Sequence, residues 1–162
     1  MRPSFSGAKL ALLHVNDNAG ESALIQEAID HSHTPFTLYA AQGVQPATGY
    51  FQFPAHAPYA HPDLVLLDFD TFPRTGSDFL YWLRVQKNMT AIPVIMYSGS
   101  HPLNRISQSY AAGANHFLSK ASELSRIVAI VQTLYYCMSF RTPQFGSLTR
   151  LPEYRAEPKS PT

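Results

Sequence analysis

The sequence predicts an α/β fold in which a five-stranded parallel sheet is doubly wound, with helices on both faces. Short apolar runs alternate with segments of helical periodicity along most of the 162 residues. Strict alternation of this kind produces parallel sheets with right-handed crossovers. The most apolar run, Leu64 to Asp68, follows Pro62 and Asp63 and has the length of a buried strand. The chain length suits one domain with a sizeable core.

The remaining elements follow from the same patterns. Each predicted strand is a short apolar run, and each predicted helix carries apolar residues at three- and four-residue spacing. The predicted strands span residues 10–15, 36–40, 64–68, 92–97 and 115–118, and the predicted helices span residues 77–87, 102–112 and 123–140, with a first helix after the turn at 16–18. In that first helix we expect Ala23, Leu24, Ala28 and Ile29 to share the buried face. The weak alternation of the second strand places it near a sheet edge.

The segment between the second and third strands has no clear periodicity. Residues 42–53 suit either a helix or a loop, because Pro46 is tolerated in a first helical turn whereas Gly49 weakens a helix. Residues 52–62 contain three prolines and form a loop longer than most connections. Long loops are often functional, so we expect this one to contact a partner.

The last predicted helix carries two apolar stripes. The first is wide enough to bury one face. We place Ile130, Cys137 and Phe140 on the opposite side, where an ordinary surface helix would be polar. Two occupants suit this second stripe: a second copy of the chain, which would give a homodimer, or the C-terminal segment folded back. The first stripe consists of Leu124, Ile127, Val128, Val131, Leu134, Tyr135 and Met138.

Composition excludes several classes of function. The formal net charge is +1 and the basic residues form no run, so nothing indicates a DNA partner. Cys137 is the single cysteine, which excludes an intrachain disulfide and a cysteine metal cluster. No signal peptide and no apolar stretch of about 20 residues is present, so we expect a cytoplasmic protein without a membrane partner. We expect an N-terminal tail at 1–8, a domain at 9–140 and a C-terminal extension at 141–162.

Polar side chains follow four of the predicted strands at the points where these strands end. The carboxyl ends of parallel strands meet at one edge of the sheet, where open α/β sheets bind their ligands. We therefore expect these side chains to converge on one crevice around Asp68. They are Asn16 and Asp17 after the first strand, Asp68 and Asp70 at the third, Ser98 at the fourth and Lys120 after the fifth.

Each residue type suits the handling of a phosphoryl group. A carboxylate such as Asp68 can act as a nucleophile toward phosphorus, and phosphoryl transfer depends mainly on charge neutralisation. The carboxylates of Asp17 and Asp68 and the backbone carbonyl of Asp70 are oxygen ligands of the type that Mg²⁺ prefers. Lys120 can pair with a phosphate oxygen, and Ser98 can donate a hydrogen bond to another.

Taken alone, each of these residues has a simpler structural explanation. Asp17 suits a helix N-terminal turn, Asp70 suits a turn, and Lys120 suits a solvated surface. Their order favours the functional interpretation, because each follows a different strand at the same sheet edge. The sequence therefore predicts that Asp68 accepts a phosphoryl group.

Four segments together resemble the receiver domain of the two-component response-regulator family. The resemblance covers about residues 9–140 and implies a flavodoxin-like sheet with strand order 2-1-3-4-5. It also implies Mg²⁺ as the cofactor and a histidine kinase as the phosphoryl donor. The segments are LLHVNDN at 12–18, PDLVLLD at 62–68, IPVIMYS at 92–98 and AGANHFLSK at 112–120.

The resemblance assigns a role to each candidate residue. Phe117 would be the switch aromatic, although a plain core aromatic on the fifth strand explains it equally well from the residues alone. Asn16 stands where an acidic residue is usual, so it would contribute to the metal site weakly or through water. The other implied roles are Asp68 as phospho-acceptor, Asp17 and the Asp70 backbone as metal ligands, Ser98 as switch hydroxyl and Lys120 as phosphate contact.

Within the family, the chain looks most like the single-domain regulators that partner phytochromes. The insertion at 52–62, Ala121 where many receivers have proline, and the short extension after the last helix suggest this subgroup. Pro73 also stands one residue later than the proline that is usual in this family in the loop after the acceptor residue. We expect a stand-alone regulator that signals by protein contact. The alternatives are a pseudo-receiver that is not phosphorylated and an aspartate-nucleophile phosphatase.

Overall fold

The structure is a computed structural model that describes residues 7, 9–52, 62–71, 76–86, 91–100 and 102–139. Across these residues, strands and helices alternate along the chain as the sequence predicts. The strands are β1 (Leu10–Asn16), β2 (Phe36–Gln42), β3 (Leu64–Asp68), β4 (Val94–Ser98) and β5 (His116–Ser119). The helices are α1 (Ala19–Ser32), α2 (Val44–Gln52), α3 (Gly76–Arg84), α4 (Leu103–Ala112) and α5 (Leu124–Ser139).

The five strands form one parallel sheet in the order β2-β1-β3-β4-β5. This confirms the predicted strand order and places β2 at an edge. The register aligns Asp68 with Tyr97 across β3 and β4, and Ser98 with Ser119 across β4 and β5. The carboxyl ends of β3, β4 and β5 therefore lie side by side.

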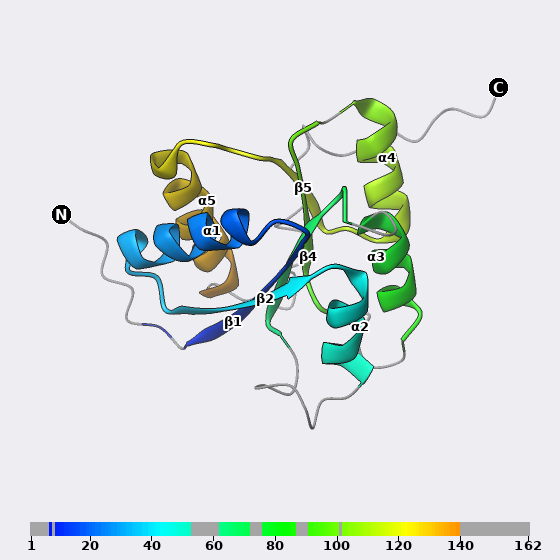
Figure 1. Ribbon diagram of the computed structural model, residues 1–162, viewed down its shortest axis with the longest axis horizontal. Coiled ribbons are helices and arrows are strands. Elements are labelled where there is room, and N and C mark those ends of the chain that lie inside the picture. The colour runs from blue at the N-terminus through cyan, green and yellow to red at the C-terminus, as the bar shows by residue number, and fades with distance from the viewer. Residues whose placement is uncertain are drawn as a thin grey trace.

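The sheet separates two apolar layers. Helices α1 and α5 cover one face, and α2, α3 and α4 cover the other (Figure 1). Successive strand residues point to opposite faces, so Leu66 packs under α1 and α5 while Leu67 packs under the other three helices. Because both faces are covered, β3 and β4 are buried along their whole length.

Helix α1 differs from the prediction in the face that it buries. Leu24 is 38% exposed and Ala23 is exposed, whereas Ile25 and Ser22 are buried with the correctly predicted Ala28 and Ile29. The helix also begins at Ala19 and continues to Ser32. The prediction for Ala23 and Leu24 was wrong because the polar Ser22, which we did not expect in the core, faces the sheet.

The uncertain segment at 42–53 forms α2, with Pro46 in its first turn. Helix α4 ends at Gly113, which has φ 108° in the left-handed region that glycine adopts readily. Strands β4 and β5 each begin and end slightly later than predicted, and α3 ends at Arg84.

Helix α5 buries the predicted first stripe, but the second stripe was wrongly placed. Ile130 and Cys137 are half-buried and pack against the core layer under α1 and α5. Ile130 is three residues from Ile127 and four from Leu134, and this spacing puts it beside the buried stripe. The exposed apolar side chain on the outer face is Tyr136, at 54%.

Several predicted features lie outside the described residues. These are most of the loop at 52–62, Pro73, Phe140, most of the N-terminal tail at 1–8 and the C-terminal extension at 141–162. In the part of the chain that is described, no helix combines the length and the apolar character needed to cross a bilayer.

Candidate functional site

Asp68 is the last residue of β3 and its side chain lies at the carboxyl edge of the sheet. The residue is 6% exposed. Its Oδ1 accepts a hydrogen bond from the backbone N–H of Asp70 at 3.0 Å, and its Oδ2 accepts one from Nζ of Lys120 at 2.6 Å. Thr71 Oγ1 donates to the Asp68 backbone carbonyl at 2.7 Å. These bonds fix the carboxylate at the end of a buried strand.

Lys120 follows β5 and reaches across the sheet edge to two acidic residues. Its backbone N–H donates to the carbonyl of Ser98 at 2.8 Å, which places it beside β4. Its Nζ lies 2.6 Å from Asp68 Oδ2 and 2.9 Å from each carboxylate oxygen of Glu21. Burial lowers the pKa of Lys120, but the hydrogen bonds that it donates to Asp68 and Glu21 outweigh burial and raise this pKa above its ordinary value. Lys120 is therefore a charged group held beside the carboxylate of Asp68.

Asn16 is fully buried and its amide is used within the protein. Its Nδ2 donates to Ser22 Oγ at 2.7 Å and lies 3.3 Å from Nδ1 of His14. Its Oδ1 accepts the backbone N–H of Asn18 at 2.8 Å. Both ends of the amide thus hold the start of α1 against β1. The structure therefore gives Asn16 a structural role, and its weak or water-mediated contribution to a metal site stays a prediction.

His14 completes this buried network beneath the site. It is fully buried on β1, and its Nδ1 lies 3.0 Å from Ser22 Oγ. Burial, with a smaller contribution from the charge of Lys120, lowers the pKa of His14 from 6.5 to about 4. The imidazole is therefore neutral near pH 7.

Asp17 is exposed and directly follows β1. The helix N-terminal role considered for it belongs instead to Asn18, whose Oδ1 accepts the N–H of Gly20 at 2.9 Å. Asp17 and Asp68 are hard oxygen donors, and Mg²⁺ binds to one or two carboxylates while keeping several waters. In the described residues no cluster of three acidic, histidine or cysteine ligands exists. The carboxylates of Asp17 and Asp68 are of the donor type that Mg²⁺ takes, so the chemistry of these residues fits this ion.

Ser98 ends β4 and is fully buried. Its Oγ donates to the carbonyl of Ser100 at 2.5 Å and accepts from Arg105 Nη1 at 3.1 Å. The same Nη1 donates to Asp70 Oδ2 at 2.8 Å. Asp70, predicted to supply only its backbone, thus also forms an ion pair with α4. Phe117 is fully buried among the residues packed under α2, α3 and α4, so it is a core aromatic in this conformation.

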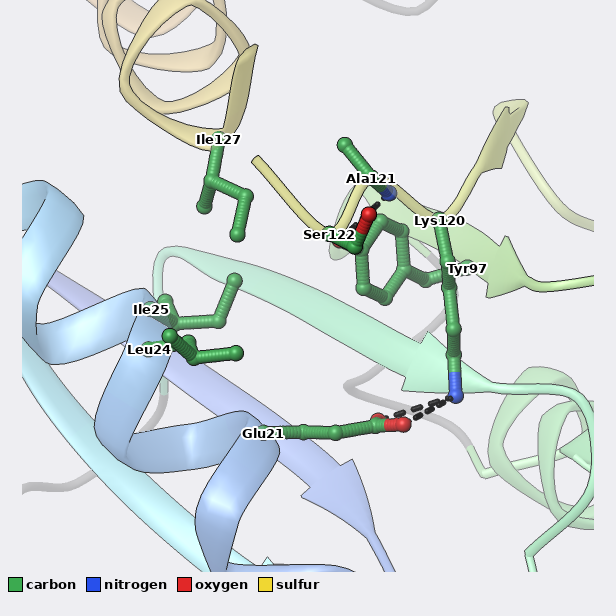
Figure 2. Close-up of a pocket in the computed structure, with 8 residues that line it drawn as sticks. All are labelled: Glu21, Leu24, Ile25, Tyr97, Lys120, Ala121, Ser122 and Ile127. Carbon is green, nitrogen blue, oxygen red and sulfur yellow. Dashed lines mark hydrogen bonds and ion pairs between the residues drawn. The ribbon is translucent and has the colours of Figure 1, made fainter. Parts of the chain in front are cut away.

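A hollow of about 280 Å³ lies beside Lys120, and Figure 2 shows the side chains that line it. It lies between the start of α1 and the start of α5, and the ring of Tyr97 forms one wall. The Tyr97 hydroxyl accepts the N–H of Ala121 at 3.4 Å, a donor that a proline at this position would lack. The lining residues are Glu21, Leu24, Ile25, Tyr97, Lys120, Ala121, Ser122 and Ile127.

The sequence missed three residues of the site. Glu21 was not predicted as part of the site, because an acidic residue in the first turn of a helix is common for structural reasons alone. His14 was hidden inside an apolar run. Arg105 lies on a helix whose orientation relative to β4 follows from packing, so no local pattern predicts its contact with Ser98.

Comparison with known proteins agrees with this geometry. The model of the response regulator receiver domain family matches residues 13–132. The response regulator Rcp1 of Synechocystis sp. (strain ATCC 27184 / PCC 6803 / Kazusa) is 25% identical over 122 residues, which cover 75% of this chain and 83% of Rcp1.

Solved structures show the same fold. The phosphorylated cyanobacterial phytochrome response regulator RcpA has a TM-score of 0.73 and 28% identity, over 83% of this chain and 98% of RcpA. The Mn²⁺-bound form of Rcp1 has a TM-score of 0.69 and 24% identity, over 82% of this chain and 96% of that one. With the family model matched over most of the sheet, this chain belongs to the response regulator receiver domain family of two-component systems.

Proposed function

We propose that this protein is a stand-alone response regulator that accepts a phosphoryl group on Asp68 from a histidine kinase. The single observation that supports this most strongly is the contact between Lys120 Nζ and Asp68 Oδ2 at 2.6 Å, at the end of a buried strand. It pairs a nucleophilic carboxylate with a fixed cation, which is the arrangement that phosphoryl transfer requires.

The chemistry is a displacement at phosphorus. An oxygen of the Asp68 carboxylate forms a bond to phosphorus, the bond from phosphorus to the donor's imidazole nitrogen breaks, and that nitrogen takes up a proton. The product is an acyl phosphate. Lys120 neutralises negative charge that gathers on the phosphoryl oxygens, because it already lies within hydrogen-bonding distance of Asp68.

Mg²⁺ is the proposed cofactor. Asp17, Asp68 and the backbone carbonyl of Asp70 would hold it, and it would neutralise further phosphoryl charge when bound. The donor chemistry of these residues and the Mn²⁺-bound form of the similar Rcp1 support this assignment. Asn16 would contribute only weakly or through water, since both ends of its amide already form hydrogen bonds within the protein.

Signalling would follow from a local rearrangement. A phosphoryl dianion on Asp68 would attract the Ser98 hydroxyl, and the Phe117 side chain would shift with it. The output is contact with a downstream protein. A homodimer through α5 belongs to the same proposal, with Tyr136 as its exposed apolar residue in place of Ile130 and Cys137.

The similarity to phytochrome-associated regulators supports a phytochrome-type kinase as the donor. We propose that the receiver domain spans 9–140, between a tail at 1–8 and an extension at 141–162, and that the protein acts in the cytoplasm without binding DNA or membrane.

One specific observation favours a pseudo-receiver as the second candidate. The neutral, fully engaged Asn16 removes a charge from the proposed metal site. A receiver that binds Mg²⁺ too weakly would keep the fold and the partner contacts without phosphorylation.

Incubation with acetyl phosphate and Mg²⁺, followed by intact mass measurement, separates these functions. We expect one added phosphoryl group on the natural sequence and none on Asp68→Asn. Asp30→Asn, which changes an exposed acid on α1, should be modified like the natural sequence. A folded protein without an adduct at any Mg²⁺ concentration would favour the pseudo-receiver, and continuous phosphate release from many substrates would favour a phosphatase.

A further inference from the structure

Arg105 connects α4 to the acceptor loop through three contacts. Its Nη1 donates to Asp70 Oδ2 at 2.8 Å and to Ser98 Oγ at 3.1 Å. Its Cζ lies 4.2 Å from the centre of the Phe69 ring, which is close enough for a cation–π contact. No predicted role of the site uses this residue.

The Ser98 hydroxyl is fully engaged in this arrangement. A serine hydroxyl has one proton to donate and two lone pairs. The proton goes to the carbonyl of Ser100 at 2.5 Å, and the oxygen accepts from Arg105 and, at 3.3 Å, from the N–H of Ser100. Ser98 is also fully buried, so water cannot replace a lost partner. The hydroxyl must give up these bonds before it can donate to a group on Asp68.

Arg105 is anchored by residues that neighbour the acceptor. It lies in the first turn of α4, where the helix dipole disfavours a cation, so its position depends on the carboxylate of Asp70. Asp70 is itself tied to Asp68, because its backbone N–H donates to Asp68 Oδ1 at 3.0 Å. The guanidinium side chain is only 22% exposed, which limits its freedom to leave.

We propose that Arg105 is a positioning residue for Ser98. Anchored on Asp70 and Phe69, its guanidinium holds the Ser98 hydroxyl on the carbonyl of Ser100 and so opposes the capture of Ser98 by a phosphoryl group on Asp68. This inference rests on the proposed function, in which Ser98 responds to phosphorylation. Arg105 then sets how readily the phosphorylated arrangement forms.

The test compares binding of a phosphoryl mimic, fluoroberyllate with Mg²⁺, to matched variants. Arg105→Met combined with Asp70→Asn removes the ion pair without changing net charge. We expect this double variant to bind the mimic about three- to tenfold more tightly, the effect of one hydrogen bond that no longer has to break. In a Ser98→Ala background the same two changes should have no effect on affinity, because Arg105 acts through Ser98. If the double variant, with Ser98 retained, binds the mimic no more tightly than the natural sequence does, the proposal is overturned.

A second readout does not depend on phosphorylation. In the unmodified protein, amide hydrogen exchange at Ser100 and in the first turn of α4 should be faster in the double variant than in the natural sequence. Arg126→Gln, which removes an exposed arginine from α5, is the control and should change neither readout. If the natural sequence binds no fluoroberyllate, the proposed function fails, and unchanged exchange in the double variant would refute the role of Arg105 by itself.

Discussion

At the scale of single residues, the ammonium group of Lys120 is held in place by several hydrogen bonds. Two carboxylates share its ammonium group, with Glu21 contacting it through both oxygens and Asp68 through one. Hydrogen bonds to charged groups are stronger than neutral ones. A phosphoryl group on Asp68 would therefore meet a cation that is already oriented, and Glu21 would compete with it for the same three donors.

Replacing Lys120 with glutamine should weaken binding of fluoroberyllate by at least about tenfold, since one charge-assisted hydrogen bond contributes about 1.5–3 kcal/mol. Titration followed by tryptophan or tyrosine fluorescence gives the affinity. Lys9→Gln, at an exposed lysine before β1, is the matched control and should bind like the natural sequence. Equal affinity in the two variants would show that Lys120 does not contact the phosphoryl group.

Asn16→Asp should strengthen Mg²⁺ binding, because it adds a negative charge directly beside the proposed ligand Asp17. The same change should destabilise the metal-free protein by about 1–3 kcal/mol, because a carboxylate cannot donate to Ser22 or His14. Mg²⁺ titration and urea unfolding measure the two effects. Asn18→Asp adds the same charge but keeps the acceptor that caps α1, so its stability should be nearly unchanged. Unaltered Mg²⁺ affinity in Asn16→Asp would contradict this account of the metal site.

The depressed pKa of His14, about 4 against 6.5 in the unfolded chain, makes stability depend on pH. Below pH 6.5 the unfolded chain binds a proton that the folded protein does not, so stability is lost as the pH falls toward 4. We expect this residue to account for about 2 kcal/mol of loss between pH 7 and pH 5. Urea unfolding at both values should show a smaller loss in His14→Gln, and no such difference in the exposed His31→Gln. Equal losses in all three proteins would contradict the buried neutral imidazole.

The sequence was sufficient to place Asp68, Ser98 and Lys120, because strand ends are marked by local composition and parallel strands align their ends. It could not reveal the Glu21 and Arg105 contacts, which depend on how α1 and α4 pack on the sheet. Asn16 shows the same limit. Its position suggested a weak metal ligand, and the sequence could not show that its amide also bonds residues of α1 and the turn before it.

At the scale of elements, the connection from α4 to β5 depends on glycine. Gly113 has φ 108°, and a Cβ added there would lie 2.8 Å from Cγ of Arg84. Arg84 Nε donates to the Gly113 carbonyl at 3.0 Å and its Nη2 to Asn115 Oδ1 at 2.8 Å, so α3 is tied to this turn. This turn leads directly into β5, so the shape of the turn affects where β5 and its residue Phe117 lie.

Gly113→Ala should lower the free energy of unfolding by at least about 1 kcal/mol, since alanine is strained at positive φ and would displace Arg84. Gly49→Ala is the matched control. A Cβ at Gly49, inside α2, meets nothing within 4 Å, so this change should stabilise the protein by about 0.5–1 kcal/mol. Urea unfolding of both variants measures the contrast. The same sign of effect at both positions would contradict the described backbone.

Helix faces were predicted less well than the elements themselves. In α1 the buried polar Ser22 shifted the face away from Ala23 and Leu24, and in α5 the core layer reached Ile130 and Cys137. Hydrophobic periodicity gives a direction, but the width of the buried face is set by the neighbouring helix. Here α1 and α5 cover the same side of the sheet (Figure 1), and side chains of both helices belong to one apolar layer.

At the scale of the whole molecule, a regulator that signals by protein contact needs a surface that another protein can bind. The described outer face of α5 is mostly polar, with Tyr136 as its large apolar side chain. If α5 forms a homodimer, the full-length chain should have twice the monomer mass in solution, and Tyr136→Glu should reduce it to the monomer. Light scattering measures both masses, together with a chain that lacks residues 141–162. A monomer in all three proteins would rule out the dimer.

The central claim is that Asp68 is the phospho-acceptor of this receiver domain. Peptide mapping by mass spectrometry, after treatment of the full chain with acetyl phosphate and Mg²⁺, tests it most directly. The account predicts one hydroxylamine-sensitive phosphoryl group, on Asp68, formed more slowly when Lys120 is replaced by glutamine. A phosphoryl group found on Asp17 or Asp70, or no modification of the folded protein at any Mg²⁺ concentration, would contradict it.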